Sequence, residues 1–336
     1  IIHKKSEALW IERPDQNKTD LEKAFEWCSS KNIKKIILLG AGGIREDHML
    51  GNLFVVSKFS DLFELLKKSK YRKYATVLVP EKAEAKQVSV AHCSKYVEKI
   101  EHGLLDEKEQ RRLGLQWSPV LAKRSFIAVN GSLLAARSAL KYGVSCHLAG
   151  GTHHSHFDFG SGFCVFNDLA YTALTLTRTK EVKKILIFDC DVHQGDGTAR
   201  ILDNNDNTFT CSIHAKKNFP YRKASSDLDI DLEDGLPWSL YRERLIEGLN
   251  KCMERFSPDL ILYVAGVDVH ENDKLGRLGI DDKGLFEREI MVLTYFKKKG
   301  IPLATVMGGG YSDDRKELAK RHSTVIKAAH EVWSYV

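Results

Sequence analysis

Short apolar runs alternate with longer stretches of helical periodicity through most of the chain. Three of the runs, at 184–189, 259–268 and 301–307, lack the polar alternation of a half-exposed strand, so they predict strands buried on both faces of a sheet. The spacing of apolar residues predicts helices over residues 132–142, 166–177, 241–256, 282–299 and 318–333. Strands and helices in alternation predict a doubly wound α/β fold, in which helices cover a mainly parallel sheet.

Acidic residues and a histidine close two of these apolar runs. Asp189, Asp191 and His193 occupy alternate positions at the end of the first run, and Asp268 ends the second. Alternate positions of a strand share one face, and sites in parallel sheets lie beyond the carboxyl ends of the strands. Two carboxylates and one imidazole leave a position open for water, which is typical of a catalytic zinc site. The alternative is a polar loop that happens to follow a strand.

Two further segments contain residues suited to the same chemistry. His153 and His154 are adjacent in the glycine-rich stretch 150–162, where imidazoles suit proton transfer beside a metal. Tyr311 follows three glycines after the third apolar run, and glycine allows a close approach of the backbone. Taken alone, the histidines could be a solvated or capping pair, and the glycine–tyrosine stretch an ordinary loop.

Together the four segments resemble the histone deacetylase superfamily, which comprises zinc-dependent histone deacetylases, acetylpolyamine amidohydrolases and acetoin-utilisation proteins. The resemblance spans residues 56–333 and is closest to the bacterial branch similar to class IV deacetylases. The matching motifs, in family order and spacing, are at 90–97, 143–168, 189–193, 212–214, 226–229, 266–268, 273–276 and 308–311. This resemblance implies a three-layer αβα architecture with a central, mainly parallel sheet, the arginase/deacetylase fold.

The resemblance also implies roles for the matching residues. The ligands of one zinc ion would be Asp191, His193 and Asp268. The residues acting in catalysis would be His153, His154, Asp189, Asp196 and Tyr311. The walls of an acyl tunnel would include Phe163, Phe219, Gly162 and Gly309. A structural potassium ion would be surrounded, partly by backbone oxygens, by Asp189, Asp191, His193, Ser212 and Ile213.

The implied reaction is hydrolysis of the amide of acetyl-lysine, or of a related acylated amine, by water that zinc activates. Asp189 would face His153 and Asp196 would face His154, and these carboxylates would fix the tautomers and raise the basicity of the imidazoles. His154 in particular would remove the water proton, and Tyr311 would hydrogen-bond the developing oxyanion. The expected partner is therefore an acylated lysine of a protein or an acylated small amine.

Three alternatives stay open at this point. Arginase-like enzymes of the same fold use two manganese ions, but here the next alternate position after His193 is Gly195 rather than an acid, which favours a single metal. A small-molecule or acetylpolyamine amidohydrolase is the second alternative, because Glu271 and Asp273 could attract a cationic substrate, unless they are ordinary loop acids. A catalytically weak protein that binds acyl-lysine is the third.

The composition limits the classes of binding partner that we expect and the expected cellular compartment. The net charge is +6 and the content of apolar residues 43%, with the basic residues spread along the chain, so we expect no nucleic-acid partner. No apolar run approaches the ~20 residues of a membrane span, and we expect no signal peptide or membrane partner. Seven cysteines without a CxxC pair predict reduced thiols in a cytoplasmic protein.

The front of the chain departs from the deacetylase pattern. Residues 11–53 resemble the interior of a bacterial thiamine pyrophosphokinase, although that family's earlier acidic motif and later thiamine-binding domain have no match here. We therefore expect an N-terminal extension over residues 1–32 and a deacetylase-like catalytic domain over 33–336. In one hypothesis the apolar residues 36–39 fill the place of the first deacetylase strand, and Arg45 is the only candidate for an arginine behind the metal; in the other, the segment is an appendage.

Overall fold

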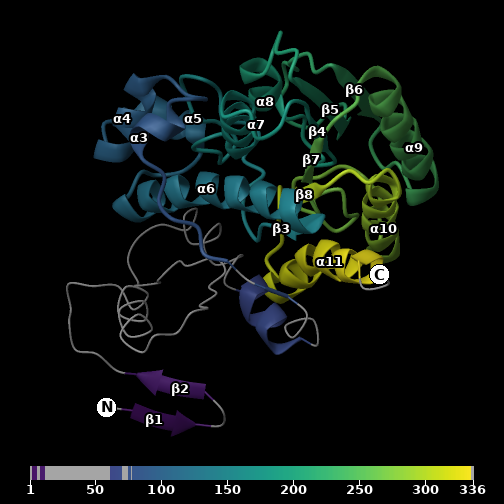
Figure 1. The fold of residues 1–336 in the computed structure, drawn as a ribbon, viewed down its shortest axis with the longest axis horizontal. Coiled ribbons are helices and arrows are strands. Elements are labelled where there is room, and N and C mark those ends of the chain that lie inside the picture. Colours follow the sequence, from purple (N-terminus) through teal and green to yellow (C-terminus); the bar gives the residue numbers. More distant parts are fainter. Residues whose placement is uncertain (1, 6–7, 12–60, 70–74, 77, 334–336) are drawn as a thin grey trace.

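The computed structural model describes residues 2–5, 8–11, 61–69, 75–76 and 78–333 (Figure 1). At the N-terminus, strands β1 (Ile2–Lys5) and β2 (Ala8–Ile11) form an antiparallel hairpin, which the apolar pattern did not predict. The expected strand at 36–39, Arg45 and the boundary between residues 32 and 33 lie outside the described residues.

A six-stranded sheet forms the centre of the described structure. Its strands are β3 (Val144–Cys146), β4 (Ile185–Asp189), β5 (Thr208–Ala215), β6 (Leu228–Leu232), β7 (Leu260–Val264) and β8 (Leu303–Val306). The spatial order is β3-β8-β7-β4-β5-β6, and every neighbouring pair is parallel. The prediction of a doubly wound parallel sheet is therefore confirmed. Because all six strands run the same way, their carboxyl ends share one edge, where side chains from distant segments meet.

Helices lie on both faces of this sheet (Figure 1). One group comprises α3 (Ala85–Val88), α4 (Ser94–His102), α5 (Glu107–Leu113), α6 (Pro119–Tyr142), α7 (Asp168–Arg178) and α8 (Asp196–Ile201). The other comprises α9 (Trp238–Arg255), α10 (Asp282–Lys298) and α11 (Arg315–Trp333). The expected helices at 166–177, 241–256, 282–299 and 318–333 correspond to α7, α9, α10 and α11 within three residues at each end.

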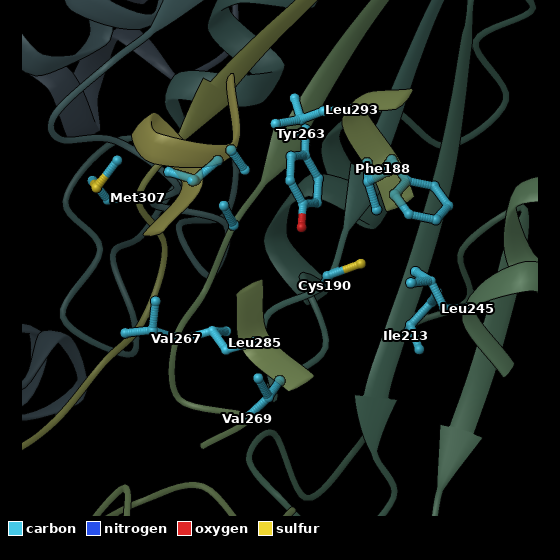
Figure 2. Close-up of a cluster of buried hydrophobic side chains, with 14 of the residues drawn as sticks. Phe188, Cys190, Ile213, Leu245, Tyr263, Val267, Val269, Leu285, Leu293 and Met307 are labelled. Carbon is cyan, nitrogen blue, oxygen red and sulfur yellow. The ribbon is translucent and has the colours of Figure 1, made fainter. Parts of the chain in front are cut away.

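Two apolar cores separate the three layers. Alternate residues of β4 enter opposite cores: Leu186 and Phe188 pack with α9, α10 and α11, whereas Ile185 and Ile187 pack with the helices of the other face. Figure 2 shows the first core, in which Phe188 and Tyr263 lie side by side. All five side chains of β4 are buried, which explains why this strand has a continuous apolar sequence.

Helix α6 is twice as long as the apolar pattern predicted. It begins at Pro119 rather than at residue 132, because the Ser118 side chain accepts a hydrogen bond from Leu121 N and proline occupies the first turn. Gly131 lies in its middle, where a Cβ atom would come within 2.7 Å of the His147 imidazole. The glycine interrupts the apolar periodicity but permits this close packing.

Candidate active site

Four loops at the carboxyl edge of the sheet converge on one site. They follow β3, β8, β7 and β4, which are consecutive neighbours in the sheet. The loop after β3 holds His153 and His154, the loop after β4 holds Asp191 and His193, and Asp268 follows β7. Asp191 and His193 do not project from the strand as expected, because β4 ends at Asp189; it is the loop, not strand alternation, that orients them.

Asp191, His193 and Asp268 form a compact group of candidate metal ligands. His193 Nδ1 lies 3.1 Å from Asp191 Oδ1 and 3.1 Å from Asp268 Oδ2. One ligand atom from each residue lies within 4.8 Å of the others, and all three side chains are buried. Within the described part of the chain, no other cluster of three histidine, cysteine or acidic residues has this geometry.

The backbone holds both carboxylates in place. Asp191 Oδ2 accepts a hydrogen bond of 2.5 Å from Gly309 N, and Asp268 Oδ1 accepts one of 2.9 Å from Val192 N. Each aspartate also lies between two buried apolar neighbours in the sequence, of which Cys190, Val267 and Val269 are labelled in Figure 2. The ligands are therefore oriented before any ion binds, which reduces the entropy lost on binding.

The charges of this group suit a divalent cation. Burial and the neighbouring Asp191 raise the pKa of Asp268 to about 7. Burial alone would lower the pKa of His193, but hydrogen bonds to Asp191 and Asp268 outweigh it and raise this pKa to about 10. Two buried carboxylates and one imidazole thus share protons that a cation would displace. This donor set fits zinc, which accepts nitrogen and carboxylate oxygen in catalytic sites.

Two histidine–carboxylate pairs lie beside the candidate ligands. His153 Nδ1 is 2.6 Å from Asp189 Oδ2, and His154 Nδ1 is 2.7 Å from Asp196 Oδ1. The two imidazole rings are 4.2 Å apart. Because each Nδ1 faces a carboxylate, each Nε2 is left for the reaction.

The pKa values of the two imidazoles are shifted in opposite directions. Burial would lower the pKa of His153, but Asp189 and Asp191 outweigh it and raise the pKa to about 9. Burial and the nearby His153 lower the pKa of His154 to about 4. In the metal-free protein at neutral pH, these pKa values favour a cationic His153 and a neutral His154 that can accept a proton.

Two partly exposed aromatic residues lie beside the site. The Phe219 ring lies 4.9 Å from that of His154, nearly perpendicular to it, and the Phe163 ring lies 6.2 Å from that of Tyr311. Phe163 and Phe219 remain 40% and 38% exposed, so they can meet an incoming chain. Gly162, at φ 54°, leaves no room for a side chain, because a Cβ atom would lie 2.6 Å from the His154 ring.

Tyr311 and Gly309 both lie close to the candidate metal ligands. Tyr311 presents its ring at 88° to that of His193, with 6.2 Å between centroids. Gly309 N donates a hydrogen bond of 2.5 Å to Asp191 Oδ2. In the group expected around potassium, the register of β4 and β5 places Ser212 beside Asp189, while the side chain of Ile213 belongs to the apolar core.

Two residues that contact the candidate site were not recognised from the sequence pattern. Asp168 accepts hydrogen bonds from Gly151 N (3.0 Å) and Thr152 N (2.7 Å), so it fixes the loop that leads to the histidine pair. His156 shares Asp196 with His154, at 3.1 Å from Asp196 Oδ2. The only signals in the sequence were an acid at the start of a helix (Asp168) and a third histidine in one loop (His156). Neither signal indicates which residue is the hydrogen-bond partner.

The geometry also bears on Asp273, which was considered as an attractor of cations. Its carboxylate accepts hydrogen bonds from the backbone N–H groups of Leu275, Gly276 and Tyr311, at 2.6–2.9 Å. An acid already bonded by three donors organises its own loop. This supports the interpretation of Asp273 as a loop acid.

The chain belongs to the histone deacetylase family, because the family model of the histone deacetylase domain matches residues 53–328. An uncharacterized protein of Picosynechococcus is 40% identical over 290 residues, covering 86% of this chain and 95% of its own. The acetoin utilization protein AcuC of Staphylococcus xylosus is 29% identical, covering 81% of this chain and 74% of its own. Histone deacetylase 2 of Arabidopsis thaliana is 29% identical over 54% of this chain and 48% of its own.

Solved structures show the same architecture. An acetylpolyamine aminohydrolase from Burkholderia pseudomallei superposes with a TM-score of 0.66 at 17% identity, covering 86% of this chain and 94% of that one. The HD domain of HDA15 superposes with a TM-score of 0.67 at 20% identity, covering 82% and 81%. The expected arginase/deacetylase fold is thereby confirmed.

Two findings concern other parts of the chain. Residues 2–66 match the model of the thiamin pyrophosphokinase catalytic domain, which overlaps the start of the deacetylase match. Among the described residues, no helix combines the length and the apolar character needed to cross a membrane.

Proposed function

We propose that this chain is a zinc-dependent deacetylase that hydrolyses the amide of acetyl-lysine or of a related acylated amine. The observation that carries this proposal is the buried group of Asp191, His193 and Asp268 beside two histidine–carboxylate pairs of unequal proton affinity. Membership of the histone deacetylase family supports deacetylation as the reaction class. A bound zinc ion would supply Lewis-acid polarisation of the amide carbonyl and a water of lowered pKa.

The protein groups then have separate tasks. His154 is neutral and buried, so its Nε2 accepts the proton of the attacking water and later returns it to the leaving amine. His153, whose Nδ1 faces Asp189 Oδ2 at 2.6 Å, would in its protonated form stabilise negative charge that develops beside it. The hydroxyl of Tyr311 donates a hydrogen bond to the oxyanion of the substrate carbonyl.

A two-metal, arginase-like reaction has less support. A bridging acid would have to occupy the position of Gly195, where a Cβ atom would lie 2.6 Å from Asp189 Oδ2 and 3.2 Å from His153 Nδ1. No carboxylate side chain fits in that space. An acetylpolyamine is the second candidate substrate; of the two acids that could attract it, Glu271 and Asp273, Asp273 already accepts three backbone hydrogen bonds.

A comparison of substrates with a ligand variant tests this proposal. Zinc-loaded protein would be assayed on an acetyl-lysine peptide, acetylated polyamines and lysines with longer acyl chains, with Asp268→Ala beside Asp282→Ala, an exposed acid outside the site. We expect turnover of acetyl-lysine, one zinc ion per chain, and loss of both in Asp268→Ala only. Two ions per chain, full metal content in Asp268→Ala, or binding of acetyl-lysine peptide without turnover would contradict the proposal.

We also propose that residues 1–32 form an extension and that residues 33–336 are the catalytic unit. Every proposed site residue lies between His153 and Tyr311, so the extension supplies no catalytic group. Deletion of residues 1–32 should leave metal binding intact, whereas deletion through residue 39 should lower solubility or stability. Equal behaviour of both truncations would refute a role for 36–39 in the sheet, and formation of thiamine pyrophosphate from ATP and thiamine would refute the division itself.

A further inference from the structure

Asp196 lies between two histidines rather than beside one. Its Oδ1 is 2.7 Å from His154 Nδ1, and its Oδ2 is 3.1 Å from His156 Nε2. An ionised carboxylate only accepts hydrogen bonds, so both imidazoles must donate to it. Asp196, His154 and His156 are 6%, 5% and 8% exposed, so little of their surface is in contact with solvent.

A surface pocket of about 390 Å³ borders this group on the side of His156. Asp196 and His156 contribute to its wall, together with Phe157, Arg200 and other residues. Among the described residues, His156 is the only hydrogen-bond donor to Asp196 Oδ2. Without that donor, Oδ2 would face a space large enough for several waters, and their hydrogen bonds would compete with the orientation that places Oδ1 against His154.

The His156 ring is itself fixed from several directions. It stacks on Phe159 with 4.3 Å between ring centroids, and the Arg112 guanidinium covers that phenyl ring at 4.0 Å. The His156 backbone N–H donates to Phe159 O at 2.9 Å, and the His156 backbone carbonyl accepts from His92 Nδ1 at 2.9 Å. These contacts orient the imidazole toward Asp196 whether or not a ligand is bound.

We propose that His156 is a positioning residue of the active site: its Nε2–H fixes the Asp196 carboxylate, which in turn aims His154 at the reacting atoms. The proposal rests on the proposed function only in assigning proton transfer to His154. The hydrogen bonds and the ring contact described for His156 join it to Asp196, Phe159 and His92, and none of these residues is a candidate metal ligand. The effect of His156 should therefore fall on kcat and leave substrate binding unchanged.

Two variants separate the hydrogen bond from the packing. His156→Phe keeps a ring to stack on Phe159 but removes the donor. His156→Gln removes the ring but can place an amide N–H near the position of Nε2. Phe157→Ala is the matched control, because Phe157 lines the same pocket, is 54% exposed, and keeps its backbone bond to Cys93 N.

The first readout is the imidazole N–H resonance of His154 in metal-free protein, assigned by its loss in His154→Ala. We expect this resonance to persist in wild type, His156→Gln and Phe157→Ala, and to shift or broaden in His156→Phe. The second readout is steady-state kinetics of zinc-loaded protein, in which His156→Phe should lower kcat by about tenfold or more, as for other outer-sphere partners. In this variant KM and zinc content should stay within twofold, and His156→Gln should recover most of kcat.

An unshifted His154 resonance and normal kcat in His156→Phe would overturn the proposal, as would a folded His156→Gln no better than His156→Phe. Failure of the proposed function looks different. In that case wild type turns over no acylated substrate, while the resonance of metal-free protein still decides whether His156 positions the pair.

Discussion

Gly309 offers a direct test of the metal site, because its missing side chain makes room for two ligands. A Cβ atom at this position would lie 2.7 Å from Asp268 Cγ and 2.8 Å from Asp191 Oδ2, and would overlap Asp268 Oδ2. Gly309 is not in the left-handed region of φ, so Gly309→Ala introduces no backbone strain. The perturbation is confined to a methyl group placed between two candidate ligands.

The expected effect follows from the available space. Carbons in contact are ~3.5–4.0 Å apart, so Asp268 must retreat by about 1 Å. It cannot simply turn, because Oδ1 accepts from Val192 N at 2.9 Å and Oδ2 lies 3.1 Å from His193 Nδ1. A zinc–oxygen bond is only ~2.0–2.2 Å long, so this retreat removes one of three ligands. We expect the Kd for zinc to rise at least about 100-fold, or about 2.7 kcal/mol.

The assay is competition for zinc between metal-free protein and a chromophoric chelator. Gly279→Ala is the control, because its Cβ atom would come no closer than 3.1 Å to another atom and lies away from the ligands. Circular dichroism and thermal unfolding without metal would show that both variants are folded. If folded Gly309→Ala binds zinc within threefold of wild type, then Asp268 is not a ligand in the arrangement described.

Three further outcomes follow from the site. Tyr311→Phe should lower kcat by roughly two to three orders of magnitude with little change in KM, because the hydroxyl acts on the transition state; an unchanged kcat would exclude Tyr311 from the reaction. His154→Ala should retain zinc yet lose most turnover, with a smaller loss in His153→Ala, and metal analysis beside steady-state kinetics would reveal the reverse order if the assignment is wrong. Burial lowers the pKa of His92 from 6.5 to about 4, so between these values the unfolded chain binds more protons and stability falls as pH falls, by up to about 3 kcal/mol. In chelator-treated protein, urea unfolding at pH 4.5 and 7 should show a smaller difference for His92→Gln than for wild type; equal differences would contradict this.

The central strands of the sheet could be predicted from the sequence because burial on both faces decides their composition. The buried strands β4, β7 and β8 must be apolar on both faces, and residues such as Phe188 and Val264 are therefore visible as uninterrupted runs. The first half of α6 could not be predicted in the same way. This helix packs against neighbours on several sides, and Gly131 breaks the periodicity that would have marked it.

Part of the candidate site could likewise be predicted from the sequence, and part could not. Asp191, His193 and Asp268 could be proposed from residue type and their place after strands, and family motifs supplied the partners of His153 and His154. The unequal proton affinities of the two histidines could not be predicted, since they depend on distances to Asp189 and Asp191 and on burial. His156 was missed for the same reason, because a loop brings it to Asp196 across 40 residues.

The parallel pairing of β4 with β7 has a consequence for how the chain folds when zinc is present. Two of the residues that would hold the ion, His193 and Asp268, lie 75 positions apart. They meet because β4 and β7 are aligned with Asp189 opposite Val264. A slip of one residue would move one loop by ~3.3 Å relative to the other and reverse which core each side chain enters, and that distance exceeds a zinc–ligand bond. An ion would therefore recognise a single alignment of the sheet. Zinc present during folding would favour the correctly aligned molecules, with a gain that grows with the logarithm of its free concentration.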